Sequence, residues 1–290
     1  MPKQPLPPAT HIGPVSLTIS DMEKSLAFYR TVLGLHGLTR SGRTAVLGSA
    51  SGRPLIALTE HKAAPPREAH AAGLDHLAIL APNRSELAGH LERMLRHEVS
   101  PQMIADHGVN ESLYLQDPDG ILIEITRDFT PEELAGHSPL GSRELAHQLL
   151  ELGRKLGGPA PPGVGADTQI GHILLRVTGL REAEQFYTRE IGFDVSLRLP
   201  GAVFVSAGRY HHHVGFHVWE TDGGLRADVS AIGLRHFTIL VPDSAAPNEA
   251  YVLRDPAGNG LAVTSPGNVT PERLIEIDQT LMNRKGRNTK

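Results

Sequence analysis

In two segments of the chain the spacing of hydrophobic residues changes in the same way. Residues 12–35 and 170–193 each open with alternating apolar and polar positions, after which apolar residues recur every three to four positions up to a glycine. The first spacing is typical of a strand and the second of an amphipathic helix. Both expected helices carry a Phe-Tyr pair, at residues 28–29 and 186–187, which we interpret as packing against a sheet. The pattern predicts two copies of a strand–helix unit.

A second repeated pattern predicts two further units. Residues 73–82, GLDHLAILAP, resemble residues 233–242, GLRHFTILVP, and each stretch has the composition of a buried strand. Each is followed by an Asp-Pro-x-Gly sequence, at 117–120 and 255–258, in which proline fixes φ and glycine tolerates a positive φ. The sequence predicts a turn at both places, with a last apolar strand leaving each turn.

Together the repeats divide most of the chain into four units, each with strands on both sides of a helix. The units cover residues 12–61, 74–127, 170–220 and 233–264. The last unit is shortened, because the stretch between Pro242 and Tyr251 has no room for a helix. The expected regions are an N-terminal half at 1–127, a helical linker at 128–168, a C-terminal half at 169–267, and a C-terminal helix with a basic tail at 268–290. This order of elements predicts an α+β fold with mixed sheets.

Composition narrows the kinds of partner. The 290 residues carry 28 Lys and Arg against 32 Asp and Glu, so the formal net charge is -4, and aromatic residues make up 4%. This balance offers no basic excess to neutralise phosphates and few side chains to stack on bases, which disfavours a nucleic-acid partner. No apolar run has the length of a membrane span, and no secretory signal is visible at the N-terminus. We therefore expect a cytoplasmic protein without a membrane partner.

Histidine stands out among the residues that carry chemistry. The chain has no cysteine, whereas histidine occurs 16 times. The absence of cysteine excludes disulfides, iron–sulfur clusters and cysteine nucleophiles. Any transition metal must therefore be held by nitrogen and oxygen. Imidazole is the usual nitrogen ligand and also carries protons near neutral pH. The histidines are therefore the first candidates for a functional site.

The four units resemble the βαβββ modules of the vicinal oxygen chelate superfamily. Their linear order resembles that of the type I extradiol catechol 2,3-dioxygenases, and the resemblance covers nearly the whole chain apart from the linker and the tail. It implies tandem βαβββ modules that form two curved mixed-sheet half-barrels, the glyoxalase/bleomycin resistance/extradiol dioxygenase fold. It also implies a metal ion inside one of these curved sheets.

The resemblance points to a set of metal ligands. In that family the opening strand of a module supplies a His, and the strand after the turn supplies a Glu. The matching first positions here are Pro14, His76, His172 and His236. The matching second positions are Glu124 and Ala262. Because only unit two paired with unit three gives a complete set, we expect His76, His172 and Glu124 to share the metal. The alternative uses His236 with a carboxylate that the sequence does not identify.

This ligand set has a chemical rationale. Two neutral imidazoles and one carboxylate suit Fe(II), and Mn(II) is the other metal that these ligand types allow. Coordination positions then stay open for the two vicinal oxygens of a catecholate and for O2. Glu124 lies in an otherwise apolar strand, ILIEI, where an unpaired buried carboxylate costs on the order of several kcal/mol. A bound metal removes that cost.

Three further residues match family positions around the substrate. His107 and Tyr114, which precede the first Asp-Pro-x-Gly turn, match residues that hydrogen-bond the bound substrate. In the run YHHHVGF the best match to the family's acid–base histidine is His212, with His211 and His213 as flanking alternatives. Histidine suits this role because its pKa lies near the working pH.

The function implied by the resemblance is that of an Fe(II)-dependent extradiol dioxygenase, which opens a catechol-type aromatic diol with O2. Its partners are then a small aromatic diol and O2, and a homo-oligomer is an open expectation because the family commonly assembles. Two alternatives keep the fold. One is a glyoxalase-like isomerase, lyase or transferase, which usually has a further carboxylate ligand. The other is a metal-free protein that binds a small molecule.

Overall fold

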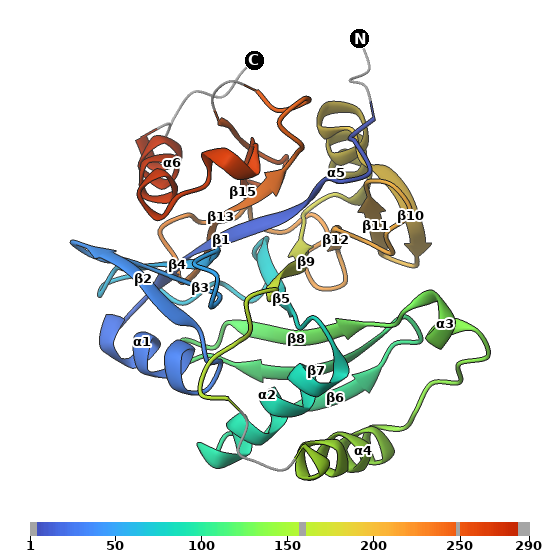
Figure 1. The fold of residues 1–290 in the computed structure, drawn as a ribbon. Coiled ribbons are helices and arrows are strands. Elements are labelled where there is room, and N and C mark those ends of the chain that lie inside the picture. Colours follow the sequence, from blue (N-terminus) through green and yellow to red (C-terminus); the bar gives the residue numbers. More distant parts are fainter. Residues whose placement is uncertain (1–4, 157–160, 248–249, 284–290) are drawn as a thin grey trace.

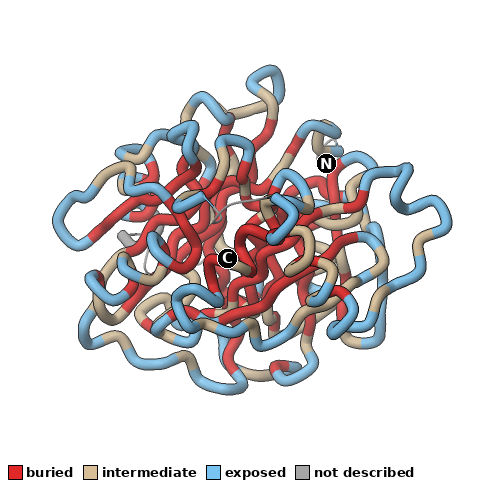
Figure 2. Tube along the Cα trace, turned by 60° about the horizontal axis from the view of Figure 1, so that its bottom comes forward, coloured by how far each residue is buried: buried red, intermediate tan, exposed pale blue. Residues whose placement is uncertain are grey.

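The computed structural model describes residues 5–156, 161–247 and 250–283. Within these ranges the fold is α+β, with helices packed on two mixed sheets of seven and eight strands (Figure 1). Buried positions lie in the interior of the molecule, whereas exposed positions gather at its periphery (Figure 2). Residues 157–160 of the expected linker and the basic tail at 284–290 lie outside the described residues.

The first sheet joins strands from units one and four, and we call it the one–four sheet. Its strands are β1 (His11–Ile19), β2 (His36–Ser41), β3 (Thr44–Gly48), β4 (Pro54–Glu60), β13 (Gly233–Leu240), β14 (Tyr251–Arg254) and β15 (Gly260–Thr264). They lie in the order β14-β15-β13-β1-β4-β3-β2, and β1 runs antiparallel to β13 where the two units meet. Segments from opposite ends of the chain therefore share one sheet.

The second sheet joins units two and three, and we call it the two–three sheet. Its strands are β5 (Gly73–Leu80), β6 (Met103–Asp106), β7 (Asn110–Gln116), β8 (Leu122–Asp128), β9 (Gln169–Arg176), β10 (Asp194–Leu199), β11 (Ala202–Ser206) and β12 (Val214–His217). They lie in the order β10-β11-β12-β9-β5-β8-β7-β6, with β5 antiparallel to β9 at the centre. The pairing of unit two with unit three that the ligand pattern favours is confirmed.

Helices follow the first strand of the first three units. They are α1 (Met22–Thr31), α2 (Arg84–Arg96) and α5 (Leu180–Gln185), the last of which continues as a π-helix at Phe186–Ile191. The side chains of Asp21 and Asn83 accept hydrogen bonds from amides in the first turns of α1 and α2, which is the usual capping role of these residue types. In unit four the described residues between Pro242 and Tyr251 form turns, as the short spacing predicts.

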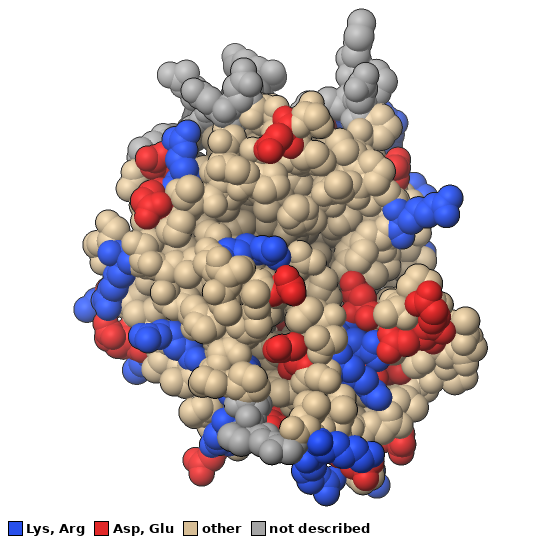
Figure 3. Space-filling model, in the orientation of Figure 1, with Lys and Arg blue, Asp and Glu red and all other residues tan. Residues whose placement is uncertain are grey.

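The remaining helices lie in the linker and near the C-terminus. α3 (Pro131–Leu134) and α4 (Ser142–Lys155) follow β8, and α4 packs beside α2 and β6 (Figure 1). A 3-10 turn at Pro266–Asn268 precedes α6 (Pro271–Asn283), which contacts β2, β4 and β14 of the one–four sheet. Among the described residues no helix combines the length and the apolar character needed to span a bilayer. Positive and negative side chains are interspersed over the face drawn in Figure 3.

Two buried Tyr–Asp hydrogen bonds connect the two sheets. The Tyr29 hydroxyl of α1 donates to Asp117 Oδ2, in the turn between β7 and β8, over 3.0 Å. The Tyr187 hydroxyl of the π-helix donates to Asp255 Oδ2, in the turn between β14 and β15, over 3.1 Å. Burial raises the pKa of Asp117 to about 6, although the amide of Ile121 and the Tyr29 hydroxyl oppose the rise. The tyrosines that we interpret as packing residues therefore also carry polar bonds.

We expect Tyr29→Phe to lower the free energy of unfolding by about 2 kcal/mol at pH 7, because the buried, ionised Asp117 loses a donor that phenylalanine cannot replace. At pH 4 the Asp117 carboxyl, with its pKa of about 6, is mostly protonated. The loss should then shrink to about 1 kcal/mol, since a neutral hydrogen bond contributes less. Urea unfolding at both pH values measures the effect, and equal stability of the wild type and the variant would contradict it.

Candidate metal centre

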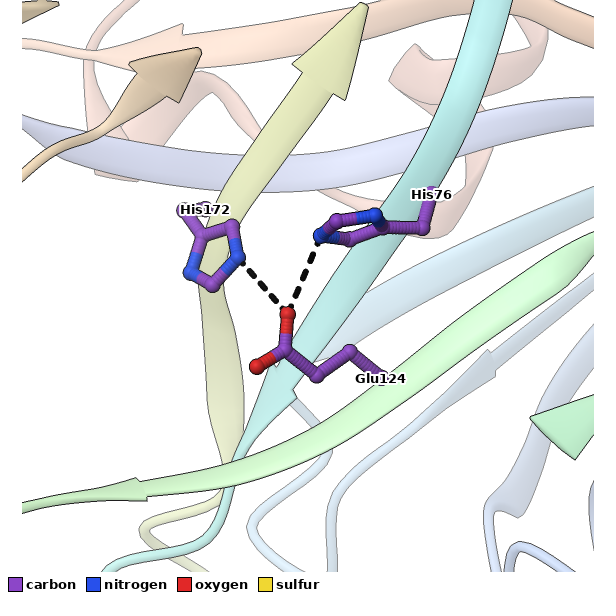
Figure 4. A group of neighbouring side chains, drawn as sticks. All are labelled: His76, Glu124 and His172. Atoms are coloured by element: carbon purple, nitrogen blue, oxygen red, sulfur yellow. Dashed lines mark ion pairs between the residues drawn. The ribbon is translucent and has the colours of Figure 1, made fainter. Parts of the chain in front are cut away.

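Three side chains from neighbouring strands of the two–three sheet converge on one point. Glu124 on β8 and His172 on β9 both pair with Ala78 of β5, the strand between them. Residues opposite each other in a ladder share a face, and His76 shares the face of Ala78 because it lies two residues away on the same strand. Figure 4 shows both imidazoles directed at the carboxylate of Glu124.

The distances among these three side chains suit a shared ion. His76 Nε2 lies 3.0 Å and His172 Nε2 lies 2.9 Å from Glu124 Oε2. One ligand atom from each residue lies within 4.8 Å of the others. Two nitrogens and a carboxylate oxygen on one side of a point are the donor set of a two-His-one-carboxylate site, which leaves the other side open. The sequence-predicted ligands are therefore brought together.

Burial and orphaned polar atoms at this point also fit a cation. Glu124 is 1% exposed, His172 2% and His76 9%. Glu124 Oε2 faces the two histidine Nε2 atoms, and the buried His172 Nδ1 makes no hydrogen bond to the described residues. When both Nε2 atoms carry lone pairs, a divalent cation between the three residues would supply the positive charge that the buried carboxylate requires.

The charges around the cluster favour a positive charge at its centre. Burial raises the pKa of Glu124, but His172 and His76 outweigh it and hold that pKa well below its usual range. Burial lowers the pKa of His76, but Asp75 and Glu124 outweigh it and raise that pKa to about 9. Burial lowers the pKa of His172, so His76 is the imidazole of the two that favours its charged form beside the carboxylate.

Neighbouring side chains hold two of the three residues in place. The Ser112 hydroxyl of β7 donates to Glu124 Oε1, the oxygen that does not face the histidines. Asp75 Oδ1 lies 3.1 Å from Nδ1 of His76. Neither Ser112 nor Asp75 is among the sequence-predicted site residues. Asp75 directly precedes His76, but sequence spacing alone does not say which way its carboxylate points.

His107 and Tyr114 lie beside the cluster, as the resemblance implies. Tyr114 on β7 pairs with Glu124 on β8, so its ring shares the face of the cluster, with its centroid 5.7 Å from that of His76. His107 Nε2 lies 2.9 Å from the Tyr114 hydroxyl. The two residues thus form a hydrogen-bonded pair at the edge of the site.

The three histidines at 211–213 have different surroundings. The His212 ring centroid lies 4.3 Å from that of His172, and its pKa is held well below the usual range by burial and by His172 and His211. His211 lies between His212 and a carboxylate, with Nδ1 2.8 Å from His212 Nδ1 and Nε2 3.0 Å from Asp128 Oδ1. His213 is held elsewhere, since its Nδ1 accepts from the amide of Ala207. Only His211 and His212 of this run face the cluster.

The matching place in the one–four sheet is filled by the protein itself. His236 is fully buried, with Nε2 3.3 Å from Ser16 Oγ and Nδ1 3.6 Å from Asp278 Oδ1. Asp278 belongs to α6 and is held by Arg235 over 2.6 and 2.7 Å. Ala262, at the position of the missing glutamate, packs against Ile277 of α6. Asp278 is thus the carboxylate near His236, but a guanidinium already neutralises it.

A glycine occupies the position related to Glu124 by the internal repeat. Gly215 on β12 pairs with Leu174 on β9, as Glu124 on β8 pairs with Ala78 on β5. A Cβ at Gly215 would lie 2.5 Å from Leu174 Cδ1 and 2.8 Å from Phe204 Cδ1. The two apolar side chains therefore cover this position. The further carboxylate of a glyoxalase-like site has no counterpart here.

Comparisons with known proteins show which family this chain is similar to. A family described as the glyoxalase/bleomycin resistance protein/dioxygenase superfamily matches residues 11–125. The catechol-2,3-dioxygenase of Bacillus subtilis (strain 168) is 38% identical over 241 residues, which cover 80% of this chain and 83% of that protein. The biphenyl-2,3-diol 1,2-dioxygenase 2 of Rhodococcus globerulus is 30% identical over 126 residues, which cover 42% and 66% of the two chains.

Solved structures share the fold at low sequence identity. A protein of Bacillus subtilis subsp. subtilis strain 168, described as a candidate dioxygenase, superposes with a TM-score of 0.62 at 12% identity and covers 98% of this chain and 92% of its own. Glyoxalase I of Zea mays superposes with a TM-score of 0.53 at 13% identity and covers 94% and 96%. At these identities the structural likeness concerns the fold alone.

Proposed function

Because the chain belongs to the glyoxalase/bleomycin resistance protein/dioxygenase superfamily, we propose that it is an extradiol dioxygenase that opens a catechol-type aromatic diol with O2 and uses Fe(II). The observation that carries the proposal is the buried cluster of His76, Glu124 and His172, in a chain that is 38% identical to a catechol-2,3-dioxygenase over most of its length. The repeat-related position opposite Glu124 is a glycine, so one side of the cluster stays free of protein ligands.

The metal centre consists of His76, His172 and Glu124 in this proposal. Fe(II) held by these residues would bring a catechol and O2 together, and the diol itself would supply the electrons that reduce O2, because both oxygen atoms enter the ring-opened product. The residues themselves contribute one negative charge and two neutral donors, so an anionic diol is attracted to the remaining positive charge. Mn(II) fits the same donor types.

The neighbouring polar residues position the substrate and its protons. His212 Nδ1 is engaged by His211, which leaves Nε2 free to take a proton from a catechol hydroxyl and to return it later. The hydrogen-bonded pair of Tyr114 and His107 offers a donor to a substrate oxygen on the other side of the cluster. The low exposure of the cluster limits the access of bulk water.

The reaction is tested by reconstitution. The protein is stripped of metal, loaded anaerobically with Fe(II) or with Mn(II), mixed with catechol and then given O2. We expect a yellow ring-opened product in proportion to the O2 consumed. Iron-loaded protein that consumes no O2 with any of a panel of catechols would overturn the proposal. Turnover without O2 would favour the glyoxalase-like alternative, and catechol binding without metal would favour a binding protein.

An apolar row of side chains runs from the cluster toward the edge of the sheet. Ladder pairing places Leu197, Phe204, Gly215, Leu174 and His76 opposite one another on successive strands, and therefore on one face. Leu197, at the edge, is 49% exposed. We infer that the substituent of the diol lies along this row.

We expect Phe204→Ala to raise kcat/KM for a catechol with a bulky apolar substituent by about 10-fold relative to unsubstituted catechol, because the truncated side chain leaves room beside His212. The ratio of the two kcat/KM values is the measurement. Phe28→Ala serves as the matched control and should leave the ratio unchanged, because Phe28 lies on α1, which follows β1 of the one–four sheet. An identical ratio in all three proteins would contradict the assignment.

A further inference from the structure

A half-buried carboxylate connects the candidate metal centre to two other strands. Asp75 Oδ1 lies 3.1 Å from His76 Nδ1, and Asp75 Oδ2 lies 3.1 Å from both His217 Nε2 on β12 and Arg176 Nε on β9. The Arg176 guanidinium in turn reaches Glu220 Oε2 over 2.8 Å. Asp75 therefore uses both of its oxygens, one toward the expected ligand and one toward the scaffold.

A β-bulge directs this carboxylate. In the β5–β9 ladder Leu74 pairs with Leu175 and His76 pairs with Leu174, so that Asp75 has no residue opposite it. An extra residue in one strand twists the strand locally and turns its side chain away from the regular alternation. Adjacent side chains of a regular strand point to opposite faces, so the bulge explains how Asp75 and His76 meet.

The same bulge occurs in unit four with the opposite charge. In the β1–β13 ladder Ser16 pairs with His236 and Leu17 pairs with Leu234, which leaves Arg235 without a residue opposite it. The repeats GLDH and GLRH thus place an acid beside the histidine of the expected metal centre and a base beside the other. Arg235 is bound to Asp278. A cation beside His236 would disfavour a metal, whereas an anion beside His76 favours one.

The two expected histidine ligands differ in whether their Nδ1 atom has a hydrogen-bond partner. His76 has Asp75 as an acceptor for its Nδ1–H, which assigns the free lone pair to Nε2, the atom that faces Glu124. His172 Nδ1 is buried without a hydrogen-bond partner among the described residues. One ligand is therefore fixed in tautomer and orientation, and the other is held by packing.

We propose that Asp75 is a positioning residue for the metal centre, and that its carboxylate orients His76 and makes it the more firmly held of the two histidine ligands. This inference rests on the proposed function only in taking His76, His172 and Glu124 as ligands. It assigns Asp75 no contact with substrate or metal.

The test measures metal binding apart from turnover. Metal-free wild type, Asp75→Asn and Asp75→Ala are titrated anaerobically with Fe(II) against a chelator, and their thermal unfolding is followed without metal. Removing the partner of a metal-bound histidine typically weakens binding by about 10–100-fold. We expect about 10-fold for Asp75→Asn, which keeps an acceptor but not the charge, and about 100-fold for Asp75→Ala. Co(II) loading should give an altered visible spectrum in both variants.

Asp119→Asn is the matched control. Asp119 is also a partly buried aspartate with hydrogen bonds, to the amide and hydroxyl of Ser20, and it lines the same small pocket as Asp75 without touching the cluster. We expect its Fe(II) affinity to stay within about twofold of the wild type.

Two results would overturn the inference. One is wild-type Fe(II) affinity in folded Asp75→Ala, and the other is an equal loss in Asp119→Asn. If Asp75→Ala fails to fold, the near-isosteric Asp75→Asn takes its place, and wild-type Fe(II) affinity in that variant would overturn the inference. Wild type that binds Fe(II) but cleaves no catechol would contradict the proposed function while leaving the role of Asp75 measurable.

Discussion

Glu124→Ala should abolish ring cleavage and remove iron from the purified protein. The variant loses the only carboxylate of the cluster, so two neutral imidazoles remain to hold a divalent cation in a buried place, and the charge of the ion is left uncompensated. We expect an affinity loss above about 100-fold and activity at background. His76→Ala and His172→Ala should behave alike. Metal analysis and O2 uptake after anaerobic loading with Fe(II) measure both effects.

His236→Ala is the control for this set. His236 occupies the repeat-related position in the one–four sheet, where Arg235 already neutralises the nearby carboxylate of Asp278. We expect iron content and activity to match the wild type, with a loss of stability of about 1–3 kcal/mol from the vacated buried space. Loss of iron in His236→Ala, with iron retained in Glu124→Ala, would place the metal in the one–four sheet and contradict the assignment of the ligands.

His212→Gln should lower kcat by about 100- to 10,000-fold while leaving the iron content unchanged, because a glutamine can hydrogen-bond but cannot carry a proton. The ring of His212 lies beside that of His172 and close to Phe204, but His212 is not one of the three expected metal ligands. Single-turnover kinetics with a saturating catechol, together with metal analysis, separate this effect from a loss of metal.

His213→Gln tests the choice among the neighbouring histidines. Its Nδ1 accepts from the Ala207 amide and its ring packs near Phe193, away from the cluster. We expect its kcat to stay within about threefold of the wild type. A large kcat effect in His213→Gln, with none in His212→Gln, would move the acid–base role to the other residue.

The architecture follows from local patterns in this chain, because each unit repeats a strand–helix signature and an Asp-Pro-x-Gly turn. The partnership of unit two with unit three is a nonlocal fact, yet it could be predicted because Pro14 and Ala262 leave the other pairings without a full set of ligands. His107, Tyr114 and His212 also lie around the cluster, as the resemblance implies. Their roles remain predictions.

Other features depend on register, which the sequence does not display. The bulge at Asp75 exists only in relation to the partner strand, so the direction of its carboxylate could not be predicted. The contact of Asp278 with Arg235 and His236 depends on where α6 packs, and an amphipathic pattern does not identify the sheet that receives the helix. The π-helix at Phe186–Ile191 is a deviation in hydrogen bonding that apolar spacing does not reveal.

The nested pairing of units also sets an order for folding on the ribosome. A nascent chain that has emerged as far as β12 holds every strand of the two–three sheet, and with them His76, Glu124 and His172. β1 has by then paired only with β4, and its other edge stays open until β13 is synthesised. Unpaired edges invite association with other chains. We expect released chains truncated near residue 225 to bind metal but to self-associate more strongly than the complete chain.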